Sequence, residues 1–370
     1  MRVVILGGAG AFGSRLAQLL TAEREIELVL AGRSLAKARA AAEPLGAEAS
    51  VIDRNGDVAA ALSALRPDAL VDASGPFQAY GERPYRVADA CLAAGAHYLD
   101  LADGTAFVAG IGVLDAEAKG RGLAVLSGAS TLPALSFAAV RALAAGLDRF
   151  DSLAIGIAPS PKAPMGLSVV AATATYAGAP VPLRRDGRET VARGLVDARR
   201  WRIAVPDGPA LAPRTFLLAD APDLRLAPQT WPELQSVWVG AGPAPQAPVH
   251  VLRALSWLRS KGLAPPLAPF APLFHRVING LRWGTDRGGM IVEAKGQRDG
   301  RTVTRAWMLT AEGADGPFIP TMACAAILRR LARGDAPPPG ARPATHELEL
   351  ADFEPFFAVR AIRTGIVETP

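Results

Sequence analysis

A run of glycines near the start of the chain has the composition and spacing of a phosphate-binding turn. Gly8, Gly10 and Gly13 fit the pattern G-x-G-x-x-G, with Ala11 and Phe12 between them. Glycine at these places allows a tight turn, close approach of the backbone to a pyrophosphate, and close packing of a helix on a strand. An apolar strand over 2–6 precedes the run and a helical pattern over 15–22 follows it. We therefore expect a dinucleotide site with the helix N-terminus facing the phosphates, rather than an ordinary glycine turn.

A second chemical signal follows the next predicted strand, 26–31, which leads into Gly32-Arg33-Ser34. In NAD enzymes an acidic residue about twenty positions after the glycines binds the ribose 2′-hydroxyl. Here that place holds Arg33, and a guanidinium beside a hydroxyl suits a 2′-phosphate through charge-assisted hydrogen bonds. Lys37, one turn into the following helix, adds a second positive charge. We predict NADP as the cofactor, against the alternative that Arg33 is a surface residue in a turn.

Strands and helices continue to alternate up to residue 127, which predicts a parallel, doubly wound sheet. Ligands bind beyond the carboxyl ends of the strands in such a sheet. The loop after strand 48–52 offers Asp53, either as an acceptor for the adenine amino group or as a turn former. The loop after strand 69–73 is predicted to contribute to the cofactor site through Ser74, Gly75, Pro76 and Phe77.

Hydride transfer needs, besides the cofactor, a group that protonates the product. We prefer Tyr80 and Asp103 as candidate catalytic residues because they lie beyond predicted strand ends. Each has an alternative role as a turn former or a wall of the site. Tyr98 and Asp100 alternate with leucines inside the predicted strand 98–101, so one pair points into a packed face and is structural.

Several of these segments resemble the NADP-binding domain of the saccharopine dehydrogenase-like reductases. The likeness rests on the glycine run, on 71–77 with Tyr80-Gly81, and on 95–101, and it continues at 128–130 and 313–317. It covers about the first 140 residues well and the C-terminal third more loosely. The resemblance implies a nicotinamide-dependent reductase with a second domain inserted before the last Rossmann helix. Family substrates range from amino-acid imines to polyketide-type enoyl groups. This chain has Ala102-Asp103-Gly104 where the family often has Gly-Glu, so no role of that glutamate is carried over.

The pattern of the chain changes at about residue 151, and 370 residues are enough for two hydrophobic cores. Short strands are predicted at 153–158 and 201–205, with a hairpin of 289–296 and 302–311 and without regular helix alternation. A helix over 320–333 precedes a proline run at 337–339. We predict an α/β fold: a Rossmann-type doubly wound parallel sheet over 1–149, completed by 313–345, and a second α+β domain over 150–312 on a mostly antiparallel sheet. The second domain would serve the substrate and dimerisation, with a homodimer as one arrangement.

One stretch of the second domain is basic and apolar. No acidic residue occurs between Glu233 and Asp286, whereas Arg253, Arg259, Lys261, Arg276 and Arg282 stand among tryptophans, phenylalanines and leucines. We favour a lid or a subunit interface with solvated charges. Contact with a membrane surface is the less favoured alternative. Prolines over 265–272 exclude one long helix.

The composition narrows the function further. The net charge of +5 comes from arginines scattered along the chain, and no nucleic-acid-binding motif is present, so we expect no nucleic acid partner. The two cysteines and the isolated histidines have no metal-ligand spacing. With neither a signal peptide nor a membrane-spanning run recognised, we expect a cytoplasmic protein. The leading hypothesis is an NADP(H)-dependent oxidoreductase acting on a carbonyl, imine or enoyl group of a small-molecule substrate. The alternative is a non-catalytic or regulatory NADP-binding protein.

Overall fold

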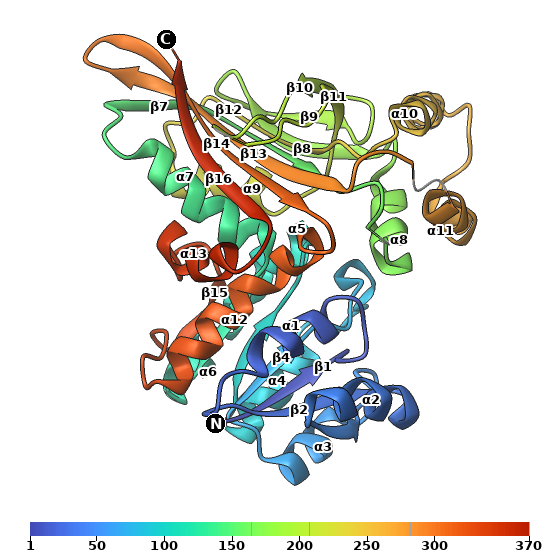
Figure 1. Cartoon of the computed structure of the whole chain (residues 1–370), viewed down its shortest axis with the longest axis vertical. Coiled ribbons are helices and arrows are strands. Elements are labelled where there is room, and N and C mark those ends of the chain that lie inside the picture. The colour runs from blue at the N-terminus through green and yellow to red at the C-terminus, as the bar shows by residue number, and fades with distance from the viewer. Residues whose placement is uncertain (164, 207, 281–282, 370) are drawn as a thin grey trace. The chain divides into compact units, whose positions relative to one another are not determined.

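The computed structural model describes residues 1–163, 165–206, 208–280 and 283–369, and the chain folds as two units (Figure 1). Unit 1 comprises Met1–Phe137 and Pro317–Phe353, and unit 2 comprises Ala138–Gly316 and Glu354–Pro370. Two of the three divisions fall within helices α7 (Ser136–Ala144) and α13 (Leu350–Ala358), and the third falls within the short 3-10 helix Gly316–Phe318. The sequence predicts boundaries at 149 and 312 and assigns no domain to the residues after 345, of which 346–353 lie in unit 1 and those from 354 onward in unit 2.

Unit 1 is built on a seven-stranded sheet in which all neighbouring strands are parallel. The strand order is β15-β6-β5-β4-β1-β2-β3, so the direction of winding reverses between β1 and β4. This confirms the predicted Rossmann-type sheet. The strands are β1 (Arg2–Leu6), β2 (Glu27–Gly32), β3 (Glu48–Val51), β4 (Ala69–Asp72), β5 (His97–Asp100), β6 (Ala124–Ser127) and β15 (Gly340–Pro343).

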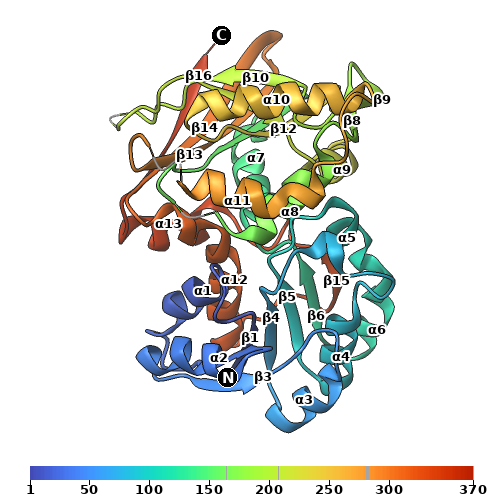
Figure 2. The same ribbon diagram turned by 90° about the vertical axis from the view of Figure 1, so that its right-hand side faces the viewer.

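Helices cover both faces of this sheet, which explains why its strands are continuous apolar runs. Figure 2 shows α1, α2 and α12 on one face and α3, α4 and α6 on the other. Val4 and Leu6 of β1 pack into the cluster that includes Val58, Leu62 and Val87 of the second group of helices. The helices are α1 (Gly13–Leu20), α2 (Leu35–Ala42), α3 (Val58–Leu65), α4 (Arg86–Ala94), α5 (Thr105–Gly110), α6 (Asp115–Gly120) and α12 (Ile319–Ala332).

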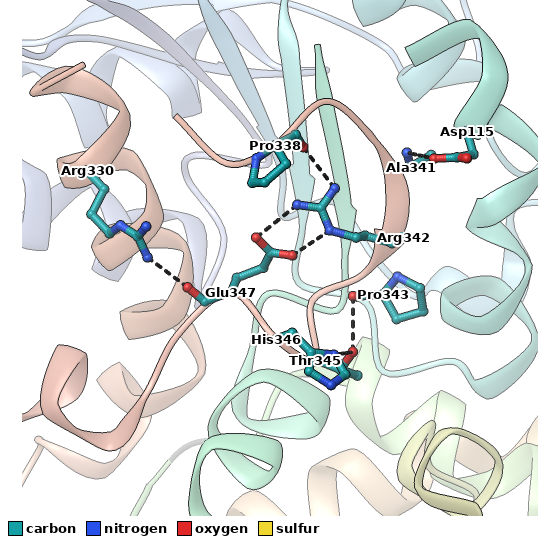
Figure 3. A network of polar contacts seen from close by, with 9 residues as sticks. All are labelled: Asp115, Arg330, Pro338, Ala341, Arg342, Pro343, Thr345, His346 and Glu347. Atoms are coloured by element: carbon teal, nitrogen blue, oxygen red, sulfur yellow. Dashed lines mark hydrogen bonds and ion pairs between the residues drawn. The ribbon is translucent and has the colours of Figure 1, made fainter. Parts of the chain in front are cut away.

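Strand β15 was not predicted, because it follows the proline run that was interpreted only as a helix stop. It pairs with β6 in parallel and extends the sheet. Polar contacts fix it in place (Figure 3): the Arg342 guanidinium binds both carboxylate oxygens of Glu347 at 2.6 and 3.0 Å and donates to the Pro338 carbonyl. Arg330 of α12 donates to the Glu347 carbonyl, and Asp115 of α6 accepts from the Ala341 amide. The strand is therefore tied directly to α6, and to α12 through Glu347.

Unit 2 is built on a seven-stranded sheet of order β10-β11-β12-β7-β13-β14-β16. Only the β12 and β7 pair is parallel within it, so the predicted mostly antiparallel sheet is confirmed. The predicted hairpin is β13 and β14, joined by a tight turn at Asp299-Gly300. The strands are β7 (Arg149–Ala158), β10 (Ala198–Trp201), β11 (Arg214–Leu218), β12 (Ser236–Ala241), β13 (Arg287–Arg298), β14 (Arg301–Glu312) and β16 (Ile362–Thr369), with a separate pair of β8 (Pro180–Arg185) and β9 (Arg188–Arg193).

One expectation for unit 2 was wrong. The strand predicted over 201–205 lies mostly beyond β10, which ends at Trp201, and Ala204 forms only an isolated bridge with Ala210. In agreement with the predicted α+β class, unit 2 contains helices α8 (Leu167–Tyr176), α9 (Asp223–Thr230), α10 (Gln246–Ser260) and α11 (Ala271–Gly280). Prolines and β-branched residues within them weaken the helical signal in the sequence, while packing on the sheet supplies their stability.

Within the described ranges, no helix combines the length and apolar character needed to cross a bilayer.

Candidate cofactor-binding site

The register of the strands in unit 1 aligns the loops that were predicted to bind the cofactor. Leu6 at the end of β1 is paired with Ala31 of β2 and with Asp72 of β4. Backbone bonds continue past the strand ends, from the Gly7 amide to the Ala31 carbonyl and from the Ala73 amide to the Leu6 carbonyl. The glycine turn, the loop after β2 and the loop after β4 therefore start side by side at the carboxyl edge of the sheet, where dinucleotides bind in such folds.

The glycine turn is tighter than its sequence pattern shows. Gly7 adopts a φ of +83°, and a Cβ atom there would lie 2.7 Å from the Ala73 carbonyl oxygen. A Cβ atom on Gly13 would lie 2.3 Å from the Gly7 carbonyl oxygen, and one on Gly10 would lie 2.9 Å from it. Gly7 was not among the predicted site residues, although its place directly after β1 marks it. A Cβ atom on Gly8 would lie 2.8 Å from the Leu30 Cβ, so the turn has no room for a side chain at any of the four glycines.

The turn leads directly into α1, which begins at Gly13 after the cap residue Phe12. Ala11 is exposed and Phe12 is half-buried. The first amides of a helix lack intrahelical partners and carry the positive end of the helix dipole, so they provide an anion site beside the turn.

The loop after β2 presents two cations and a hydroxyl. Arg33 and Lys37 are exposed, and neither side chain has a hydrogen-bond or ion-pair partner among the described residues. Ser34 caps α2, where its Oγ accepts from the Lys37 amide at 3.4 Å. The Ser34 hydroxyl proton remains available to a ligand, and no acidic residue occupies the first turn of α2. The local charge is that of a phosphate site and not of a ribose 2′-hydroxyl site.

The loop after β3 carries Asp53, whose Oδ1 accepts from the Asn55 amide at 3.0 Å. This hydrogen bond is the one expected if Asp53 acts as a turn former rather than as an acceptor for the adenine amino group. The next residue, Arg54, was not a predicted site residue, yet it reaches the loop after β4. Its Nη1 donates to the Ser74 carbonyl at 2.6 Å, and its guanidinium lies 4.3 Å from the centre of the Tyr80 ring. Arg54 therefore joins two walls of the site.

The loop after β4 is held by a buried carboxylate. Asp72 is fully buried; its Oδ1 accepts from both the amide and the hydroxyl of Ser74, and its Oδ2 accepts from the Tyr80 hydroxyl at 2.6 Å. Burial raises the pKa of Asp72, and the same burial, reinforced by the Asp72 charge, raises the pKa of Tyr80. Phe77 stacks on Tyr80 with ring centres 5.0 Å apart. Gly75 and Pro76, which connect Ser74 to Phe77, are half-buried.

Tyr80 is only 5% exposed, and its proton is held by Asp72. This geometry argues against the predicted role of Tyr80 as a proton donor. Asp103, the other candidate, is exposed at the loop after β5 and accepts from the Gln78 side chain at 3.1 Å.

A second buried carboxyl lies beside the first, because Asp72 and Asp100 are register partners on β4 and β5. Asp100 Oδ1 accepts from the Gly128 amide at 2.7 Å and from the Ala102 amide at 2.9 Å. Burial raises the pKa of Asp100 to about 7, with a further upward contribution from Asp72. The residue fixes the loops after β5 and β6, so its role is structural, as the alternation in the sequence allowed.

In the part of the chain that the structure describes, no cluster of three or more histidine, cysteine, aspartate or glutamate side chains could hold a metal ion. Cys91 and Cys324 are buried free thiols.

Comparison with known proteins agrees with this geometry. Residues 3–130 match the family described as the saccharopine dehydrogenase NADP binding domain, a range that includes every predicted cofactor residue. The matched residues make up about a third of the chain. No curated protein matches the sequence.

Solved structures resemble the chain over its whole length. Saccharopine dehydrogenase (L-Glu forming) from Saccharomyces cerevisiae has a TM-score of 0.69 at 16% identity, with 100% of each chain covered. Homospermidine synthase from Legionella pneumophila, solved in complex with NAD, has a TM-score of 0.62 at 11% identity, with 100% of this chain and 91% of that chain covered. At these identities the likeness establishes the fold. With the match of the NADP-binding domain it supports an oxidoreductase.

Proposed function

We propose that this chain is an NADP(H)-dependent oxidoreductase of the saccharopine dehydrogenase-like type. It transfers hydride to or from a carbonyl, imine or enoyl group of a small-molecule substrate. The observation that carries the proposal is the pair of anion sites on neighbouring strands of the sheet. One is the glycine turn after β1, and the other is the Arg33, Ser34 and Lys37 group after β2.

The glycine turn binds the pyrophosphate, because Gly7 and Gly10 let the backbone approach it and α1 directs its first amides at it. Arg33, Lys37 and the Ser34 hydroxyl bind the 2′-phosphate of the adenine ribose. Arg33 is suited to this because it is exposed and unpaired within the described residues. When bound, the nicotinamide ring supplies the hydride, and the chain orients the substrate and moves the proton.

Ser74, Gly75, Pro76 and Phe77 form the wall of the cofactor site beyond β4 in this proposal. Asp72, Tyr80 and Arg54 act as positioning residues, since their mutual contacts fix that wall. Asp103 is the proposed proton-transfer group, because its carboxylate is exposed while those of Asp72 and Asp100 are fully buried.

Cofactor selectivity tests the proposal. Calorimetric titration of the wild type with NADPH and NADH should show a preference of about ten- to hundredfold for NADPH, as expected from charge-assisted bonds of about 1.5 to 3 kcal/mol. Arg33→Asp should remove most of the NADPH affinity and leave that for NADH unchanged or improved. Arg24→Asp is the matched control, because Arg24 is also exposed and has no side-chain partner among the described residues. Equal affinity of the wild type for both dinucleotides would refute the NADP assignment.

Turnover requires a separate test. NADPH deuterated at one face of nicotinamide C4 is incubated with small carbonyl, imine and enoyl compounds, and the products are analysed by mass spectrometry. An enzyme transfers deuterium from one face only. Selective NADPH binding without transfer to any of the three classes would favour a regulatory NADP-binding protein.

A further inference from the structure

The basic apolar stretch of unit 2 folds into two helices with a break between them. Helix α10 ends at Ser260, a proline-rich loop follows, and α11 begins at Ala271. Figures 1 and 2 show the two helices side by side on one flank of unit 2. Arg282, which the sequence placed in this stretch, lies outside the described residues.

Large apolar side chains of this segment face solvent. Phe270, Leu273 and Val277 follow a helical spacing and are 43%, 55% and 47% exposed. Leu263 in the connecting loop is 70% exposed, and Trp257 at the end of α10 is 48% exposed. Isolated exposed apolar residues are common on proteins, but several in one segment mark an interaction surface. We call these five residues the apolar face.

The apolar face cannot turn inward, because the opposite side of α11 is already fixed. Ala271 is buried and Phe274 packs against the core that holds Val170 of α8. The Asn279 side chain donates to the Met165 carbonyl and accepts from the Met165 amide, each at 3.0 Å. The helix is therefore apolar on two sides, one inside unit 2 and one in solvent.

The segment that carries the apolar face contains cations and no acidic residue. Between Glu233 and Asp286 the sequence contains no acidic residue. Arg253 and Arg259 donate to carbonyls of neighbouring segments, so their charges are held in place but not neutralised. Lys261 and Arg276 are exposed, and neither side chain has an acceptor among the described residues. Exposed apolar groups flanked by fixed and free cations are complementary to an anionic bilayer surface.

We propose that the apolar face docks this protein on an anionic phospholipid surface. The apolar side chains enter the boundary between headgroups and acyl chains, while Lys261 and Arg276 bind lipid phosphates. A second copy of the chain fits the face less well, because a twofold interface would bring the cations of one copy against those of the other. Nor does a lid whose charges are merely solvated account for the exposed apolar residues. The inference is independent of the proposed oxidoreductase activity.

Vesicle sedimentation tests the proposal on the full chain. The wild type should sediment with vesicles of equal parts phosphatidylcholine and phosphatidylglycerol at about 0.1 M salt and not with phosphatidylcholine alone. Binding should fall toward 1 M salt, where the Debye length shortens from about 10 Å to about 3 Å. Because each basic residue contributes about fivefold to partitioning, Lys261→Gln with Arg276→Gln should bind about 25-fold more weakly.

Matched control variants test whether vesicle binding depends on this face rather than on net charge or exposed apolar side chains in general. Arg24→Gln with Arg301→Gln changes the net charge equally at exposed arginines outside the face and should leave binding unchanged. Leu273→Ser with Val277→Ser should weaken binding, whereas Val113→Ser with Val359→Ser should not, although those valines are 74% and 75% exposed. Circular dichroism checks that each variant is folded.

Three results would overturn the proposal. The first is a wild type that does not sediment with anionic vesicles at low salt. The second is a loss of binding in the Arg24 and Arg301 control as large as that in the Lys261 and Arg276 variant. The third is a wild-type dimer in light scattering that becomes monomeric in the Leu273 and Val277 variant, without vesicle binding by either. In that case the face is an interface between copies.

Discussion

The buried carboxyl of Asp100 should make unit 1 less stable as the pH rises, and Asp100→Asn should remove that dependence. A carboxyl whose pKa is raised in the folded state stabilises the fold fully below the unfolded pKa and loses this contribution as the pH rises through the folded pKa. For Asp100 these values are 3.8 and about 7. The contribution is therefore lost between about pH 4 and pH 7.

The size of the effect follows from the same shift. A difference of about three pKa units at about 1.4 kcal/mol each gives a change on the order of 4 kcal/mol in the free energy of unfolding. An asparagine keeps the shape of the neutral acid, and its oxygen can still accept from the Gly128 and Ala102 amides. The variant should match the wild type within about 1 kcal/mol near pH 4 and be more stable above pH 7.

Scanning calorimetry with a parallel fluorescence scan measures this for unit 1 alone. All six tryptophans lie in unit 2, at 201, 231, 238, 257, 283 and 307, so a calorimetric transition that tryptophan fluorescence does not report belongs to unit 1. For a unit of this size, 1 kcal/mol corresponds to about 2 to 4 °C. The difference in Tm between variant and wild type should therefore grow by about 10 °C from pH 4 to pH 7.5.

Asp335→Asn is a control variant whose effect on stability should depend on pH in the opposite direction. A hydrogen bond and the charge of Arg330 lower the pKa of Asp335, which is exposed in unit 1. Its contribution is present above the unfolded pKa and lost as the pH falls, so this variant should be the less stable one at neutral pH and equal to the wild type in acid. Parallel Tm curves for Asp100→Asn and the wild type would refute the reasoning, as would an equal loss of stability for Asp100→Asn at every pH.

Three further substitutions test the packing of the site and its support. Gly7→Ala should lower the Tm of unit 1 and the NADPH affinity together, because the new Cβ would lie 2.7 Å from a backbone oxygen at a φ of +83°; calorimetry that finds either property unchanged contradicts this. Tyr80→Phe should cost about 1.5 to 3 kcal/mol in urea unfolding through loss of the bond to Asp72, and a cost near zero would mean that the bond is not made in solution. Arg342→Lys should lower the Tm of unit 1, because lysine cannot bind both oxygens of Glu347, which is 7% exposed; Arg24→Lys is its matched control and should leave the Tm unchanged.

The fold of unit 1 was predictable because its signals are local. Apolar runs such as 2–6 are buried on both faces, and each alternates with a helix that has its own pattern. Strand β15 is not predicted because it follows a proline run, and because its pairing with β6 and its bond to Asp115 join it to residues far earlier in the chain. In unit 2, prolines and β-branched residues weaken the helical signals of α8 to α11; α9 and α10 pack on strands, whereas α8 and α11, which are distant in sequence, pack on each other.

The cofactor site was predictable in its residue types but not in its connections. The glycine spacing and Arg33 can be recognised in the sequence because each is defined by its position after the end of a predicted strand. The contacts of Arg54 with Ser74 and Tyr80 are not readable, because they join loops twenty or more residues apart. Tyr80 was chosen as a donor for its position in a loop, and only the structure shows that its hydroxyl is held by Asp72.

The two buried carboxyls also explain why residues 71–77 and 95–101, on which the resemblance rests, do not identify the substrate. Asp72 fixes the loop after β4, and Asp100 fixes those after β5 and β6, so both act on the backbone at the edge of the sheet. Any reaction at this edge of the sheet needs such residues, because mobile loops cannot hold a nicotinamide ring in a fixed position against a substrate. Within unit 1, chemical selectivity is then expected from exposed side chains on those fixed loops. Asp103 is one of them, and it stands where the resemblance leads one to expect glutamate. The departure from the family thus falls on an exposed side chain in a loop and not on a residue of the sheet.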